Sequence, residues 1–159
     1  MIEKMKVTIY TDGACSGNPG KGGFGCILVY VDSNGQKHEK EISEGYEYTT
    51  NNQMELLAVI VGLEALKRPC SVKIVSDSKY VVDSISKGWL DNWVAKNWLK
   101  SGNKPVPNAD LWKRLIKATK GHEIELEWIK GHAGYEYNER CDKLAVAAYK
   151  SSNLNKQIF

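Results

Sequence analysis

The sequence lacks several features that would assign it to a protein class at once. Its four cysteines include no C-x-x-C pair, which argues against a zinc ribbon and gives no disulfide framework, so we expect free thiols in the cytoplasm. No apolar run approaches the ~18 residues of a membrane span, and the N-terminus has no apolar leader core. We therefore expect a soluble, cytoplasmic protein that makes no membrane contact. The cysteines are Cys15, Cys26, Cys70 and Cys141.

A strong excess of one charge is also missing. The 22 Lys and Arg residues nearly balance the 19 Asp and Glu residues, and the net charge is +3 at pH 7. Any nucleic-acid contact should therefore come from a local patch rather than from the whole surface. At 159 residues the chain fits one domain, which would bury roughly two-thirds or more of its unfolded surface in one core.

Hydrophobic patterns divide the chain into strands and helices. Asn34-Gly35 favours a tight hairpin between the second and third strands, and the helix ending before Pro69 is apolar nearly all round, as in a buried helix. The expected strands are 5–12, 23–31, 37–46, 72–77 and 123–129. The expected helices are 52–66, 78–86, about 89–100, 109–119 and 137–150.

This order of elements predicts an α/β fold with a five-stranded mixed sheet flanked by helices. Three antiparallel strands, the third edge-like, are joined by crossover helices to two parallel strands. Strand 72–77 should lie parallel to strand 5–12. We assign residues 1–150 to a single domain and expect the polar tail 151–159 to be mobile.

Four carboxylates occupy positions from which they can converge. Asp12 and Asp77 each come at the end of an expected strand, Glu55 lies in the first turn of the apolar helix, and the last helix carries a fourth acid, Asp142. Each of the first three alone is better explained as a turn or helix cap, or by the helix dipole. Together they meet only at the carboxyl end of the sheet, where α/β sites form. Such a cluster repels itself without cations, and its hard oxygen ligands suit Mg²⁺ or Mn²⁺.

The glycine-rich segment 20–25 matches the G-x-G-x-x-G pattern of dinucleotide-binding proteins. The residues after it are β-type, whereas that motif requires a helix N-terminus for the pyrophosphate. Residues 17–21 do not have P-loop spacing either. We therefore interpret these glycines as turn formers that allow the backbone to approach a bulky ligand.

His132 lies on a glycine-flanked loop directly after the last expected strand. A solvated loop histidine is one explanation. Because imidazole titrates near neutrality and the loop leads to the helix of Asp142, proton transfer or product displacement beside a metal site is the other. His38 and His122 have no comparable context, and we assign them no role.

Residues 86–104 combine tryptophans with lysines. Trp89 and Trp93 are four residues apart and share a helix face, so their indoles could simply pack on the core. The alternative is a basic protrusion, at about 86–106, that lays aromatic rings along sugars and lysines along phosphates. The segment contains Trp89, Trp93, Trp98, Lys87, Lys96, Lys100 and Lys104, against one acid, Asp91.

Four separated motifs, between about residues 5 and 150, resemble those of bacterial-type ribonuclease H. They are Thr11-Asp12-Gly13 with Gly17-Asn18-Pro19-Gly20, Thr50-Asn51-Asn52 before Met54-Glu55-Leu56, Ser76-Asp77-Ser78, and Gly131-His132-Ala133-Gly134 with Asn138-Glu139-Arg140-Cys141-Asp142. The resemblance implies a ribonuclease H-like fold and endonucleolytic cleavage of the RNA strand of RNA–DNA hybrids, leaving 3′-hydroxyl and 5′-phosphate ends. It also implies two Mg²⁺ ions, or Mn²⁺ in their place, held by the four carboxylates, with His132 assisting turnover.

The resemblance further implies how a hybrid binds. Groups beside the site approach the minor groove, where 2′-hydroxyls distinguish RNA, and the protrusion contacts the DNA strand. The residues assigned to substrate are Cys15, Asn18, Thr50, Asn51, Asn52, Lys79, Trp89, Trp93 and Lys96. The chain departs from the family at Tyr135-Glu136-Tyr137, where His-Pro-Glu is more usual, and at Gln53 and Lys79, where arginine and glutamine are common.

We expect a monomeric, magnesium-dependent ribonuclease H that acts on hybrids without sequence specificity. Two alternatives stay open at this stage. A resolvase- or integrase-like nuclease of the same superfold would cut DNA duplex comparably. A non-catalytic hybrid-binding module would bind the hybrid without turnover.

Overall fold

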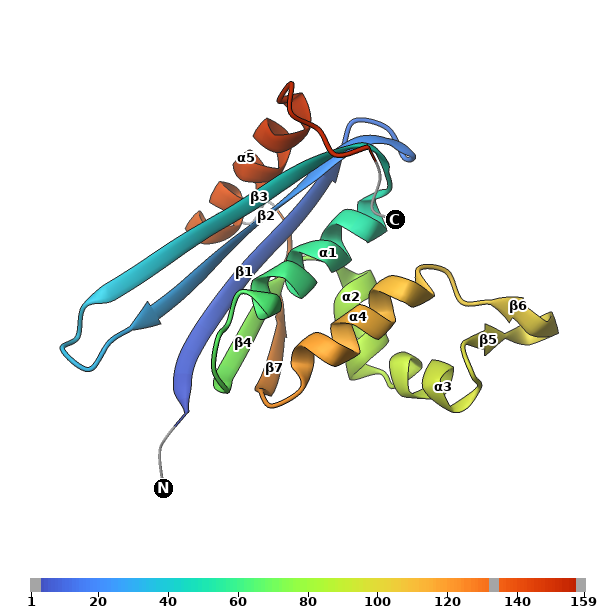
Figure 1. Cartoon of the computed structure of the whole chain (residues 1–159), viewed down its shortest axis with the longest axis horizontal. Coiled ribbons are helices and arrows are strands. Elements are labelled where there is room, and N and C mark those ends of the chain that lie inside the picture. Colours follow the sequence, from blue (N-terminus) through green and yellow to red (C-terminus); the bar gives the residue numbers. More distant parts are fainter. Residues whose placement is uncertain (1–3, 132–134, 157–159) are drawn as a thin grey trace.

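A five-stranded mixed sheet forms the centre of the computed structural model, which describes residues 4–131 and 135–156 (Figure 1). Its order is β3-β2-β1-β4-β7. The strands are β1 Met5–Cys15, β2 Gly20–Val31, β3 Lys37–Thr49, β4 Cys70–Ser76 and β7 Glu123–Trp128. β1, β2 and β3 form an antiparallel meander, and β4 pairs in parallel with both β1 and β7. The predicted α/β sheet of three antiparallel and two parallel strands is therefore confirmed, with β3 at its edge.

Helices cover both faces of this sheet. The helices are α1 Asn51–Glu64, α2 Lys79–Ser86, α3 Trp89–Ala95, α4 Ala109–Thr119 and α5 Glu136–Lys150. α1 lies between the sheet and α4, which explains why its sequence is apolar nearly all round. Thr50 caps α1 by accepting a hydrogen bond from the Gln53 backbone N–H, while the Gln53 side chain accepts one from the Thr50 N–H. α5 packs across β1, β2 and β3 on the opposite face (Figure 1).

The glycine-rich start of β2 has a different role from the one expected. Gly23 and Gly25 lie inside the strand rather than in a turn, and they face α5. A Cβ on Gly25 would lie 2.5 Å from the Cys141 carbonyl oxygen on α5. For Gly23 and Gly25, the interpretation as turn formers beside a ligand was therefore wrong, because the backbone that approaches them is that of a helix. The rejection of a dinucleotide motif stands, since no helix follows the glycines.

The helix expected at about 89–100 is shorter than predicted. It ends at Ala95 because Asn97 and Trp98 adopt left-handed backbone angles, with φ of 54° and 63°. The chain then forms a small hairpin, β5 Leu99–Lys100 and β6 Lys104–Pro105, around the 3₁₀ turn η1 Ser101–Asn103. With α3, this hairpin extends away from the sheet (Figure 1).

The start of the C-terminal tail contacts the sheet. The Asn155 backbone donates to the Gly45 carbonyl at 2.9 Å and accepts from the Glu47 N–H at 2.8 Å. Mobility of the whole tail stays a prediction. Among residues 4–131 and 135–156, no helix has both the length and the apolarity needed to span a membrane.

Candidate active site

Three of the four predicted carboxylates converge at one end of the sheet. The parallel pairing of Tyr10 with Val75 brings Asp12 on β1 beside Asp77, which directly follows β4. Asp12, Glu55 and Asp77 each offer an oxygen within 4.8 Å of the others. Glu55 is the fifth residue of α1, one residue further in than predicted, because the helix begins at Asn51.

Gly13 holds this cluster together through its backbone. Its N–H donates to Glu55 Oε1 at 2.7 Å and to Asp12 Oδ1 at 2.9 Å. A Cβ at this position would lie 2.6 Å from the Glu55 backbone nitrogen, so only glycine lets β1 approach α1 this closely. Glu55 Oε2 is buried and has no hydrogen-bond partner among the described residues. An unsatisfied buried carboxylate oxygen beside two further acids fits a cation ligand.

Burial and mutual repulsion oppose ionisation of this cluster. Desolvation, followed by the charge of Asp77, raises the pKa of Asp12 to about 7. Desolvation, with the charge of Asp12 next in importance, also raises the pKa of Glu55 well above its usual value. A divalent cation would relieve both effects because it compensates the negative charge that burial penalises.

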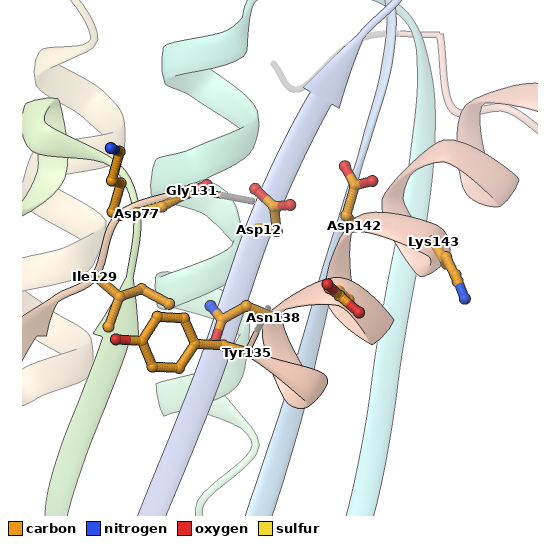
Figure 2. A pocket seen from close by; sticks show the side chains of 10 residues that line it. Asp12, Asp77, Ile129, Gly131, Tyr135, Asn138, Asp142 and Lys143 are labelled. Atoms are coloured by element: carbon orange, nitrogen blue, oxygen red, sulfur yellow. The ribbon is translucent and has the colours of Figure 1, made fainter. Parts of the chain in front are cut away.

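Asp142 reaches the same site from α5. It lines a cavity of about 210 Å³ together with Asp12 and Asp77, but it lies outside the tight group of three (Figure 2). Its charge raises the pKa of Asp12, after burial and Asp77 as larger causes. The structure therefore brings Asp12, Asp77 and Asp142 to one cavity, while Glu55 lies within 4.8 Å of the first two.

The predicted catalytic histidine, His132, lies outside the described residues. Both ends of its loop border the cavity, since Gly131 and Tyr135 line it (Figure 2). A Cβ on Gly131 would lie 2.8 Å from Asp77 Oδ2, so the backbone at Gly131 lies directly against that carboxylate. The role of His132 stays a prediction.

Two further residues at the site carried no predicted role. Trp128 Nε1 donates to the Asp77 backbone carbonyl at 3.1 Å, and its ring lies 5.1 Å from Lys79 Nζ. Asn138 lines the cavity, and its amide atoms are buried without a hydrogen-bond partner among the described residues. The strand register that pairs Trp128 with Ser76 could have identified Trp128 as a neighbour of the site, because it places Trp128 beside the residue before Asp77.

The predicted minor-groove residues gather at the far ends of β1 and β3 and the start of α1. The Asn51 N–H donates to Asn18 Oδ1 at 3.2 Å, although the two residues are 33 positions apart. Thr50 caps α1 next to them, Asn52 is exposed in its first turn, and Cys15 ends β1. The sequence-based assignment of these residues to one surface fits this arrangement, while their contact with a hybrid stays a prediction.

The predicted protrusion residues divide into two environments. Trp89 is 44% exposed, and Lys96 at the end of α3 is also exposed. Trp93 packs on the core instead, with its ring centroid 5.5 Å from that of the fully buried Trp112. The two tryptophans therefore differ, since Trp89 is exposed and Trp93 is partly buried, and contact of either indole with a hybrid stays a prediction.

Comparisons with known proteins agree with this geometry. The RNase H family model matches residues 4–150. A ribonuclease H from Lachnoclostridium phytofermentans is 56% identical over 151 residues, which cover 94% of this chain and 96% of the relative. One from Proteus mirabilis is 56% identical over 146 residues, covering 92% of this chain and 88% of the relative.

Solved structures give the same result. The crystal structure of LC9-RNase H1 superposes with a TM-score of 0.87 at 30% identity, covering 96% of this chain and 76% of that one. The family model spans nearly the whole chain, three of the carboxylates that the motifs predicted line one cavity, and the fourth, Glu55, lies beside two of them. The chain therefore belongs to the ribonuclease H family.

Proposed function

We propose that this protein is a divalent-cation-dependent endonuclease that hydrolyses the RNA strand of RNA–DNA hybrids, leaving 3′-hydroxyl and 5′-phosphate ends. The observation that carries the proposal is the convergence of Asp12, Glu55 and Asp77 within 4.8 Å, with Asp142 on the same cavity. The relatives that match most of the chain are named ribonuclease H.

The four carboxylates are the groups that would hold two Mg²⁺ ions, or Mn²⁺ in their place. Their oxygens are the hard ligands these ions prefer, and the unpartnered Glu55 Oε2 supports a cation beside α1. When bound, the ions supply Lewis-acid catalysis of phosphodiester hydrolysis.

The remaining groups of the chain orient these ligands. The Gly13 N–H donates to one oxygen each of Asp12 and Glu55 and so restrains both carboxylates. The Trp128 indole holds the backbone at Asp77. For His132 we propose proton transfer or product displacement, because Gly131 before it and Tyr135 after it line the cavity.

Recognition of the hybrid is proposed to use two surfaces. Cys15, Asn18, Asn51 and Asn52 would read the minor groove, where 2′-hydroxyls mark the RNA strand, with Thr50 and Asn18 at a DNA-strand phosphate. Trp89, Lys96 and Lys79 are exposed and would follow the nucleic-acid backbone. The solved LC11-RNase H1, which shares this fold, is described in complex with an RNA/DNA hybrid.

We further propose that the enzyme works as a monomer in the cytoplasm. All four carboxylates come from one chain, so the site needs no second copy. The four cysteines all lie in the described part of the chain as free thiols, which suits a reducing compartment.

The decisive experiment is a cleavage assay with an end-labelled RNA–DNA hybrid and matched RNA and DNA duplexes. Each is incubated with Mg²⁺, Mn²⁺ or chelator, beside an Asp12→Asn control. Cation-dependent cutting of only the RNA strand of the hybrid is expected. Comparable cutting of DNA duplex would favour the resolvase-like alternative, and hybrid binding without cutting in either cation would favour a binding module.

A further inference from the structure

Asp142 is supported differently from the other three acids. Asp12 lies on β1, Glu55 lies on α1, and Asp77 directly follows β4. These three elements contribute side chains to the same buried core. Asp142 is carried by α5, which packs on the face of the sheet opposite α1 (Figure 1). Its place at the cavity therefore depends on how the first turns of α5 are held on the sheet.

A group of side chains fastens those turns to β1. The Tyr137 ring stacks on the Tyr10 ring with centroids 4.5 Å apart and planes at 17°. Tyr10 lies two residues before Asp12 on β1, and Cys141 Sγ, next to Asp142, contacts the Tyr10 carbonyl oxygen at 3.3 Å. Both contacts therefore join α5 to β1 at Tyr10, and one of them is made by the residue next to Asp142.

The same turns are also tied to the edge strand β3. Arg140 forks between two carboxylates, with one nitrogen 3.0 Å from Glu39 Oε2 and the other 2.9 Å from Glu41 Oε2. The Tyr137 hydroxyl donates to the remaining oxygen of Glu39, Oε1, at 2.5 Å. We call Tyr10, Glu39, Glu41, Tyr137 and Arg140 the α5 clamp.

The geometry points to a positioning role for Tyr137 and Arg140: through the α5 clamp, they hold Asp142 at the cation site. The inference rests on the proposed function. Exposed ion pairs contribute little to overall stability, so we expect loss of this network to change the orientation of α5 more than the free energy of unfolding.

The test compares Arg140→Ala with Arg114→Ala. Arg114 forms the matched control because its guanidinium also pairs with a glutamate, Glu64, at 2.6 and 2.8 Å, but between α4 and α1. Cation affinity is measured without substrate, by titrating Mg²⁺ and following backbone amide NMR shifts near Asp12 and Asp142. Cleavage at varied Mg²⁺, the KM for hybrid and thermal midpoints are measured in parallel.

We expect Arg140→Ala to raise the Mg²⁺ dissociation constant and the half-saturating Mg²⁺ concentration by about 3- to 10-fold, with KM for hybrid unchanged. Tyr137→Phe, which keeps the ring stack, should raise them by about 2-fold. Arg114→Ala should leave both at the wild-type value. Equal Mg²⁺ affinity in the Arg140→Ala and Arg114→Ala proteins would overturn the inference.

A second variant sharpens the test if Arg140→Ala lowers stability. Tyr137→Ala, which removes both the ring stack and the hydroxyl hydrogen bond, should raise the Mg²⁺ dissociation constant more than Tyr137→Phe does. Equal Mg²⁺ affinity in the Tyr137→Ala protein and the wild type would count against the clamp. Failure of the wild type to cut hybrid would overturn the proposed function instead, while the substrate-free Mg²⁺ titration would still decide whether the clamp positions Asp142.

Discussion

The acid cluster and the segment from α3 to β6 are built on opposite physical principles. Asp12 and Glu55 are 8% and 9% exposed, and the cluster is held by hydrogen bonds to backbone. In the α3–β6 segment no residue is buried, and most side chains face solvent. The carboxylates of the cluster are therefore preorganised and poorly solvated, so their charges interact strongly. The lysines of the projecting segment instead stay hydrated and can adapt to a ligand.

The largest expected effect comes from removing one charge from the buried cluster. Asp12→Asn should reduce hybrid cleavage by about 1,000-fold or more, equal to roughly 4 kcal/mol of barrier, while hybrid binding survives. Single-turnover cleavage and filter binding measure the two effects. Asp110→Asn, at an exposed position on α4, serves as the control and should retain full activity. Unchanged turnover in Asp12→Asn would refute its assignment as a cation ligand.

The cluster should also give the metal-free protein an unusual pH dependence. Because the folded-state pKa of Asp12 is raised from 3.8 to about 7, the folded protein binds more protons than the unfolded chain between these values. In chelator, the free energy of unfolding should therefore fall as pH rises from about 4 to about 7, by up to about 4 kcal/mol for this group.

Urea denaturation at a series of pH values measures this dependence. Mg²⁺ should restore stability at pH 7, and Asp12→Asn should flatten the curve in chelator because its amide does not titrate. A wild-type stability that rises over the same pH range in chelator would contradict the prediction.

A methyl group at the centre of the cluster should have a smaller effect. Gly13→Ala would place a Cβ 2.6 Å from the Glu55 backbone nitrogen, which forces β1 and α1 apart and should cost about 1–3 kcal/mol of stability. Cleavage should fall with it. Gly35→Ala is the comparison, since its Cβ would meet nothing within 4 Å and only the left-handed backbone, φ 79°, opposes it. Equal losses of unfolding free energy in Gly13→Ala and Gly35→Ala would contradict the steric explanation for Gly13.

The smallest effects are expected in the projecting segment, where two tryptophans should separate. Trp89→Ala should weaken hybrid binding by about 1 kcal/mol because a stacking surface is lost, with little change in the free energy of unfolding. Trp93→Ala should mainly lower the unfolding free energy, because Trp93 packs on Trp112. Binding isotherms and denaturation curves for both variants measure this. A loss of stability for Trp89→Ala as large as for Trp93→Ala would show that both indoles pack on the core.

Local sequence patterns predicted most of the framework correctly. The period of the apolar residues identified the five strands of the main sheet, and the all-round apolar character of residues 54–66 identified α1. The pattern failed after Ala95, where the left-handed residues Asn97 and Trp98 end α3. Non-glycine residues adopt such angles only when their surroundings favour them, so composition gave no signal.

Residue type and motif alone were enough to predict the ligand chemistry: hard carboxylates after apolar runs and near a helix start, within motifs of a single family. How these groups are held depends on the tertiary structure. Gly13 bonds Glu55 across 42 positions, Trp128 bonds the residue after β4, and Arg140 reaches β3 from α5. These contacts depend on strand register and helix docking, which arise from packing of the whole chain, whereas residue type and local periodicity are properties of each segment alone.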